Sequence, residues 1–133
     1  MPRLLVVDDQ VHVRAAITVA LRANGFDVVA VESGRLGLVE LNKMPFDSPP
    51  FDLVIVDIYM PEMDGVTLIK AIRERTPNLP IIAISGMLYP VSGRSVLDHL
   101  SMAPHLSGIT YLQKPFRPKD LLQATQKAIG VAA

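Results

Sequence analysis

Residues 53–57 read Leu-Val-Ile-Val-Asp, four large apolar residues followed by a carboxylate. An unbroken apolar run of this length is typical of a strand buried on both faces, as in a parallel sheet covered by helices. Residues 4–7 (Leu-Leu-Val-Val) and 81–84 (Ile-Ile-Ala-Ile) have the same character. The three runs therefore predict an α/β domain with a parallel sheet at its centre.

The rest of the chain alternates shorter strand patterns with longer helical ones, which is typical of strands joined by crossover helices. Right-handed crossovers then make a doubly wound sheet of five strands and five helices the economical topology. We expect further strands at 26–31 and 111–113, and we expect helices at 11–23, 33–43, 66–75, about 95–102 and from 118 onward.

Composition limits the class of protein. The 133 residues fit one domain, 1–133, and they include no cysteine, so a disulfide framework and a thiolate metal site are excluded. Lys plus Arg equals Asp plus Glu at 13 each, so no overall field favours nucleic acid or an anionic membrane. With neither a signal peptide nor an apolar run of membrane-spanning length, we expect a cytoplasmic protein.

Polar residues stand where the apolar runs end. Asp8 and Asp9 follow the first run, Asp57 ends the third strand, Ser85 ends the fourth and Lys114 follows the fifth. Ligands of open α/β sheets bind at the carboxyl ends of the strands. If the sheet is parallel, these five side chains lie in one crevice.

Three carboxylates in one crevice repel each other by about 4 kcal/mol per pair at 4 Å and an effective dielectric of 20. A hard divalent cation held by Asp9 and Asp57, with Asp8 contributing through water, would offset this repulsion. Lys114 supplies a second positive charge. A carboxylate beside Mg²⁺, a lysine and a hydroxyl predicts phosphoryl transfer with the carboxylate as nucleophile.

Five motifs stand in order along the chain: Leu-Val-Val-Asp-Asp (5–9), Leu-Val-Ile-Val-Asp (53–57), Met-Pro-Glu-Met-Asp-Gly (60–65), Ile-Ala-Ile-Ser-Gly (82–86) and Tyr-Leu-Gln-Lys-Pro-Phe (111–116). Each motif alone is weak evidence, but five in order, each at a strand end, are specific. With these motifs the chain resembles the receiver domains of two-component response regulators over essentially its whole length. The resemblance implies a flavodoxin-like fold with strand order 2-1-3-4-5.

The resemblance also implies roles around the phosphoacceptor. Asp57 matches the residue that takes the phosphoryl group. Asp8 and Asp9 match the acidic pair that binds Mg²⁺ (or Mn²⁺), and the backbone carbonyl of Tyr59 matches a further metal ligand. The donor would be a phosphohistidine on a sensor histidine kinase or phosphotransfer protein.

Three further positions match the residues that respond to the phosphoryl group. Ser85 matches the hydroxyl that binds it, Lys114 the lysine that forms an ion pair with it, and Tyr111 the aromatic residue that then moves inward. The Lys114–Pro115 bond matches one that is usually cis in the family.

The resemblance thus predicts a phosphorylation-activated switch that catalyses only its own phosphoryl transfer and dephosphorylation and is not otherwise an enzyme. We expect a downstream protein target, no DNA-binding output domain in this chain, and no contact with nucleic acid or membrane. Homodimerisation through the surface of the fourth and fifth strands stays open, as does an origin in a larger response regulator or hybrid histidine kinase.

Competing interpretations weigh the same residues differently. Asp9 could simply cap the following helix. A haloacid-dehalogenase-like phosphatase shares the carboxylate nucleophile but has a second acid two residues later, where this chain has Tyr59. A flavin-binding module needs a phosphate loop after the first strand, where Asp8 and Asp9 would repel phosphate.

Three features depart from the usual receiver pattern. The residues 47–50 lengthen the connection before the third strand, and the interval from Ser85 to Lys114 is longer by several residues. Tyr59 is bulky at a place where it could shield a phosphoryl group from water. We therefore expect a change at Tyr59 to alter the lifetime of that group.

Overall fold

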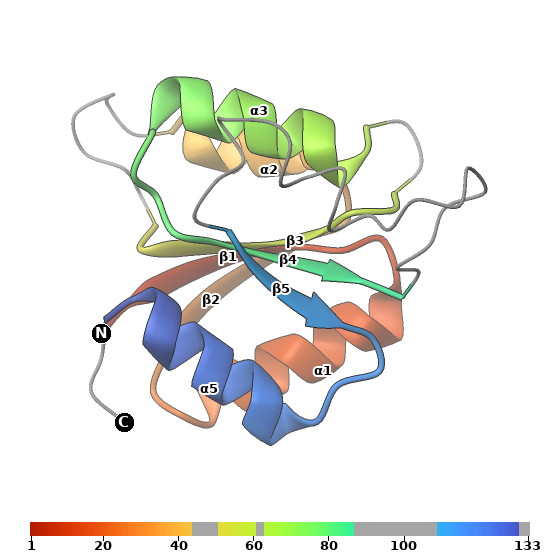
Figure 1. The fold of residues 1–133 in the computed structure, drawn as a ribbon, viewed down its shortest axis with the longest axis vertical. Coiled ribbons are helices and arrows are strands. Elements are labelled where there is room, and N and C mark those ends of the chain that lie inside the picture. The colour runs from red at the N-terminus through yellow and green to blue at the C-terminus, as the bar shows by residue number, and fades with distance from the viewer. Residues whose placement is uncertain (44–50, 61–62, 87–108, 131–133) are drawn as a thin grey trace.

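The computed structural model describes residues 1–43, 51–60, 63–86 and 109–130. Its five strands form one sheet in the order β2-β1-β3-β4-β5, and every neighbouring pair is parallel. The predicted doubly wound sheet and its strand order are therefore confirmed (Figure 1). The strands are β1 (Arg3–Val7), β2 (Asp27–Val31), β3 (Leu53–Asp57), β4 (Ile81–Ser85) and β5 (Thr110–Gln113).

Helices cover both faces of the sheet. In Figure 1, α1 and α5 lie against one face and α2 and α3 against the other. The fourth helix, expected at about 95–102, lies outside the described residues, so this prediction stays open. The described helices are α1 (Val11–Arg22), α2 (Gly34–Leu41), α3 (Gly65–Arg75) and α5 (Pro118–Ala128).

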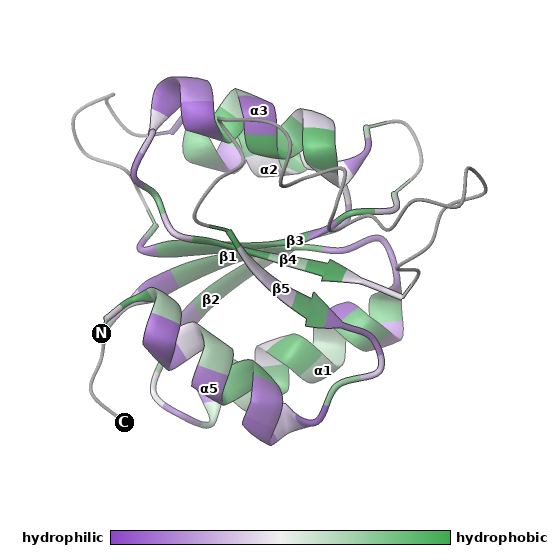
Figure 2. Ribbon diagram, viewed as in Figure 1, coloured by the Kyte–Doolittle hydropathy of each residue, from purple (hydrophilic) through white to green (hydrophobic). Residues whose placement is uncertain are grey.

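The apolar runs of the strands divide between two cores. Alternate residues of a strand point to opposite faces, so Val54 and Val56 pack under α2 and α3, while Leu53 and Ile55 pack under α1 and α5. All four are 0% exposed. Figure 2 shows the central strands as mostly hydrophobic, whereas the helices carry hydrophilic residues on their outer sides. Burial on both faces explains why these strands have no polar alternation.

Local signals set the helix limits. The Ser33 hydroxyl accepts a hydrogen bond from the Leu36 N–H and so caps α2 as expected, but α2 ends at Leu41 rather than near residue 43. Asp64 caps α3 by accepting from the Thr67 N–H. Gly25, with φ of 87°, follows α1 in a conformation that favours glycine.

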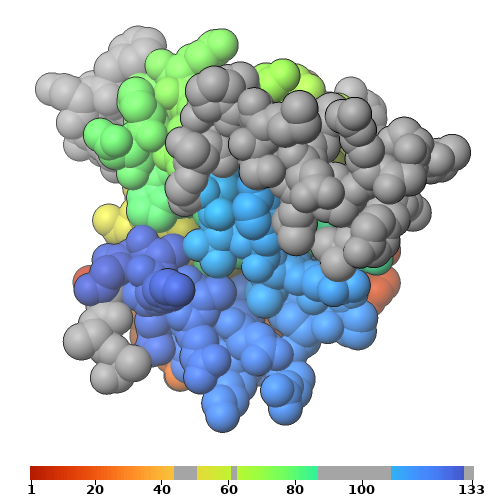
Figure 3. Space-filling view, in the orientation of Figure 1, coloured from red at the N-terminus to blue at the C-terminus, as the bar shows by residue number. Residues whose placement is uncertain are grey.

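The parallel register brings the carboxyl ends of the strands to one edge of the sheet. Beyond the paired residues, the Ile58 N–H donates to the Ile84 carbonyl at 2.9 Å and the Lys114 N–H donates to the Ser85 carbonyl at 2.8 Å. These bonds continue the ladder into the loops that carry the polar residues. In the space-filling view, β5, α5 and the segment between them form a continuous part of the surface (Figure 3).

None of the helices in the described part of the chain has the length and apolarity that a membrane span requires.

Candidate functional site

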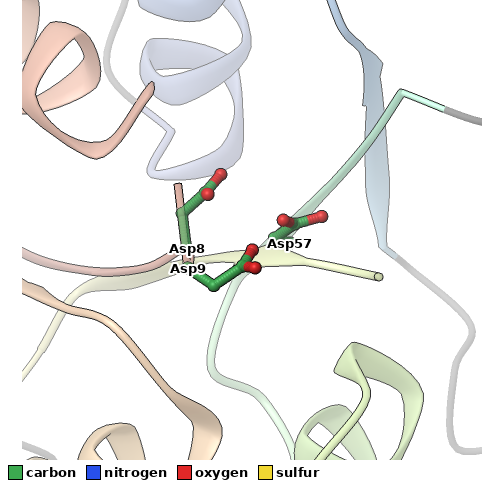
Figure 4. A group of neighbouring side chains, drawn as sticks. All are labelled: Asp8, Asp9 and Asp57. Atoms are coloured by element: carbon green, nitrogen blue, oxygen red, sulfur yellow. The ribbon is translucent and has the colours of Figure 1, made fainter. Parts of the chain in front are cut away.

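An acidic cluster lies at the carboxyl edge of the sheet. Asp8 and Asp9 follow β1, Asp57 is the last residue of β3, and each contributes a carboxylate oxygen to a group whose members lie within 4.8 Å of one another (Figure 4). Asp8 is 0% and Asp57 3% exposed. Three of the five side chains predicted to share one crevice are therefore brought together, and two of these three carboxylates are almost completely withdrawn from water.

Asp9 does not act as a helix cap. The N-cap position of α1 is Gln10, and its side chain makes no capping hydrogen bond. The interpretation of Asp9 as a structural cap is therefore wrong, and its carboxylate remains with the acidic cluster.

Lys114 is the cation of the site. Its Nζ lies 3.0 Å from Asp8 Oδ2 and 3.2 Å from Asp57 Oδ2, and only 14% of its side chain is exposed. The residue reaches this place because β5 pairs with β4 and the Lys114 N–H continues that pairing. The bond from Lys114 to Pro115 is cis, as the resemblance implies.

The surroundings of Asp57 disfavour its charge. Burial, and then the neighbouring charge of Asp8, raise the pKa of Asp57 to about 6, although Lys114 and the Tyr59 N–H act in the opposite direction. At neutral pH the carboxyl group is still ionised, but at a cost in free energy. A ligand that neutralises this edge would therefore be bound favourably.

The donor set fits a hard divalent cation. Among the described residues, three carboxylates face one ammonium and leave a formal excess of two negative charges. Oxygens on opposite sides of one Mg²⁺ are about 4.2 Å apart, close to the spread of this cluster. Asp8 Oδ2 is buried and accepts no hydrogen bond from the part of the chain that the structure describes, although Lys114 lies at ion-pair distance. The cluster therefore could hold a metal ion.

The remaining predicted residues surround the acidic cluster at different depths. Ser85 ends β4 and is 6% exposed, whereas Tyr59 is 41% exposed and its N–H donates to Asp57 Oδ1 at 3.2 Å. Tyr111 stands opposite Ala83, half-buried against the core beneath α2 and α3. Burial raises the pKa of the Tyr111 phenol. The switch roles of Ser85 and Tyr111, and the metal role of the Tyr59 carbonyl, stay predictions.

Two residues near the site were missed at the sequence level. A Cβ atom on Gly65 would lie 2.5 Å from the Asp57 carbonyl oxygen and 2.7 Å from Ile58 Cα, so α3 can begin this close to the site only with glycine. Gln10 accepts a hydrogen bond from Lys114 Nζ through its Oε1 at 3.0 Å. Gly65 lay within the quoted motif at 60–65, whereas a glutamine after an acidic pair carries no such signal.

An apolar groove opens beside the site. It has a volume of about 650 Å³ and runs between α1 and the segment that leads into α5. Lys114 and Gln10 lie on its wall together with Val13, Phe116 and Leu121. The acidic site and the groove thus share two polar residues.

A family model and individual relatives identify the same protein family. The sequence model of the response regulator receiver domain matches residues 4–126. The chemotaxis protein CheY of Bacillus subtilis is 35% identical over 128 residues, covering 96% of this chain and 98% of CheY. A probable transcriptional regulatory protein of Picosynechococcus is 33% identical over 122 residues, but these cover 90% of this chain and only 46% of that relative.

A solved structure agrees with the fold. The response regulator receiver domain protein from Clostridium thermocellum superposes with a TM-score of 0.81 at 27% identity, covering 98% of this chain and 95% of the other. The acidic edge thus occurs on the fold of a receiver domain, the phosphorylation-activated switch of two-component systems. The chain belongs to the response regulator receiver domain family.

Proposed function

We propose that Asp57 accepts a phosphoryl group in the presence of Mg²⁺, or Mn²⁺, and that Asp8, Asp9 and the Tyr59 carbonyl help to hold the cation. The proposal rests on one observation above all. A carboxylate that is 3% exposed stands within 4.8 Å of two others and 3.2 Å from an ammonium. Such an arrangement destabilises the resting protein. A buried carboxylate beside an ammonium group is, however, suited to accept a phosphoryl group.

The reaction is a transfer from a phosphohistidine. A carboxylate oxygen of Asp57 forms the new P–O bond as the P–N bond breaks, and the electron pair stays on the imidazole nitrogen, which then takes a proton. Lys114 neutralises charge on the phosphoryl oxygens from its position beside Asp57. Bound Mg²⁺ supplies further charge neutralisation for the phosphoryl oxygens.

Ser85 and Tyr111 would carry the signal away from the site. Ser85 lies at the end of β4, and Tyr111 is on the neighbouring strand, paired with Ala83. A hydroxyl drawn toward the phosphoryl group would open space for the aromatic ring. The resulting change would reach the surface of β4 and β5, where a protein target binds.

The proposed donors are a sensor histidine kinase or a phosphotransfer protein, acting in the cytoplasm. The apolar groove beside Lys114 supports this proposal, because a donor seated there would stand next to Asp57. On this view the protein acts on no external substrate. It catalyses only phosphorylation and hydrolysis at its own aspartate.

Intact-mass measurement after incubation with acetyl phosphate and Mg²⁺ tests the proposal. We expect one phosphoryl adduct in the parent and in Asp27→Ala, a matched control at an exposed aspartate of β2. We expect none in Asp57→Ala and none after Mg²⁺ is chelated. An adduct that survives Asp57→Ala would overturn the assignment of the phosphoacceptor.

A further inference from the structure

The ammonium group of Lys114 has three N–H donors, and three oxygens of the described residues lie within 3.2 Å of its nitrogen. Two are the carboxylate oxygens Asp8 Oδ2 at 3.0 Å and Asp57 Oδ2 at 3.2 Å, and the third is the amide oxygen Gln10 Oε1 at 3.0 Å. A lysine donates at most three hydrogen bonds. In the resting site, Lys114 therefore donates hydrogen bonds to Asp57 and Gln10 and forms an ion pair with Asp8.

The three partners differ in what phosphorylation does to them. Asp57 would lose a negative charge from its carboxylate when it forms the acyl phosphate, and a cation would compete with Lys114 for Asp8. Gln10 is neutral and exposed, and neither event changes its amide. Its contact with Lys114 is therefore the one that can persist through the reaction.

The backbone at Gln10 is held firmly enough to serve as an anchor. The Gln10 N–H donates to Asp8 Oδ1 at 2.8 Å, and Arg14 Nη1 donates to the Asp8 carbonyl at 2.7 Å. Gln10 is also the N-cap residue of α1, so it moves with the helix. An amide oxygen fixed to α1 thus limits where the Lys114 ammonium can go.

From this geometry we infer that Gln10 is a positioning residue for Lys114, which it holds over Asp57 so that the ammonium meets the incoming phosphoryl oxygens. The inference rests on the proposed phosphoryl transfer to Asp57. It assigns to α1 a part in the reaction, although Gln10 lies 104 residues from Lys114 in the sequence.

The first test compares rates of phosphorylation by acetyl phosphate in saturating Mg²⁺. Gln10→Met keeps the length of the side chain but cannot accept this hydrogen bond, and we expect it to lower the rate roughly threefold to tenfold. Gln123→Met makes the same chemical change at an exposed position of α5 and should leave the rate as in the parent. Equal rates in Gln10→Met and the parent would overturn the inference.

A double-mutant cycle separates positioning from a general structural effect. If Gln10 acts through Lys114, Gln10→Met has no further effect once Lys114→Met is present. If it slows phosphorylation by the same factor in both backgrounds, Gln10 does not act through Lys114. Unfolding curves in Mg²⁺ establish that each variant is folded before its rate is used.

An NMR signal of the Lys114 ammonium group tests the inference without any phosphorylation step. In ¹⁵N-lysine-labelled protein, we expect a slowly exchanging Lys114 ammonium signal, assigned by its loss in Lys114→Arg. Gln10→Met should speed its exchange with water, and an unchanged signal would contradict the inference. If the parent takes no phosphoryl group at all, the proposed function fails, while this signal still decides whether Gln10 holds Lys114.

Discussion

The interior of β3 and its last residue are almost equally buried, yet their contributions to stability are opposite. Leu53 to Val56 are 0% exposed and Asp57 is 3% exposed. Burying the apolar residues stabilises the fold by about 1.5–3 kcal/mol each. Burying the carboxylate next to Asp8 instead raises its pKa to about 6, which marks a destabilised charge. The apolar interior thus provides the stability that permits a reactive edge.

Removing apolar volume from the interior should have the largest effect. Ile55 is 0% exposed between β1 and β4, so Ile55→Ala loses transfer free energy and leaves a cavity. We expect the free energy of unfolding to fall by about 2–5 kcal/mol, measured by urea denaturation. The loss should be the same at pH 5 and pH 7.5, and a strong pH dependence would argue against a purely apolar role.

Removing the negative charge of Asp57 should increase the stability of the fold, in contrast to Ile55→Ala. In the metal-free protein we expect Asp57→Asn to raise the free energy of unfolding at pH 7.5 by up to about 3 kcal/mol, because it abolishes a destabilised carboxylate. Urea denaturation in a chelating buffer measures the change. A loss of stability at pH 7.5 would contradict this view of the edge.

The pH dependence of that difference follows from the raised pKa. The folded protein binds the Asp57 proton more tightly than the unfolded chain, so protonation stabilises the fold. This stabilisation is complete below about pH 4 and is lost as the pH rises through about 6. The advantage of Asp57→Asn should therefore grow between pH 4 and pH 6 and stay constant above.

A divalent cation should relieve the same repulsion. At a Mg²⁺ concentration 100 times its dissociation constant, the parent should gain about 2.7 kcal/mol of unfolding free energy, with a smaller gain at pH 5, where protons compete. Thermal unfolding with and without Mg²⁺ measures this gain. Asp9→Asn should reduce the gain, whereas Asp27→Asn, at an exposed site, should not. An undiminished gain in Asp9→Asn would remove Asp9 from the cation site.

The smallest expected effect concerns Tyr59, the exposed residue beside the acidic cluster. Tyr59 is 41% exposed, and its backbone N–H bonds to Asp57 whatever side chain it carries. If its ring shields the phosphoryl group from water, Tyr59→Ala should speed loss of the adduct roughly threefold, followed by intact mass. Tyr59→Phe keeps the bulk and should behave like the parent. Equal lifetimes in all three proteins would show that the Tyr59 ring does not shield the phosphoryl group from water.

The same contrast explains what could be predicted from the sequence. The run at 53–57 becomes β3 with the expected limits, because a strand that is covered on both faces needs apolar side chains at every position, and the carboxylate of Asp57 marks where the apolar run ends. The acidic edge was also predictable, since parallel strands bring their carboxyl ends together. Helix limits differed by one or two residues, as with α2, because end residues contribute little to packing.

The contacts that the sequence did not reveal are made between elements that come together only in the folded protein. The Gln10 amide meets Lys114 only because α1 and β5 flank the same edge, and no spacing rule connects the two positions. Gly65 is required because a Cβ atom at this position would clash with backbone atoms of Asp57 and Ile58. Such distances are set by how α3 packs, which a local pattern does not encode.

Chemical mapping of the phosphoryl group would show directly whether Asp57 is the phosphoacceptor. Borohydride reduces an aspartyl phosphate to homoserine, so peptide mapping after reaction with acetyl phosphate and Mg²⁺ identifies the acceptor. The assignment of Asp57 as the phosphoacceptor requires conversion at Asp57 alone, and only when Mg²⁺ is present. Conversion at Asp8 or Asp9 with Asp57 unmodified would contradict it, because the buried carboxylate beside Lys114 would then not be the nucleophile.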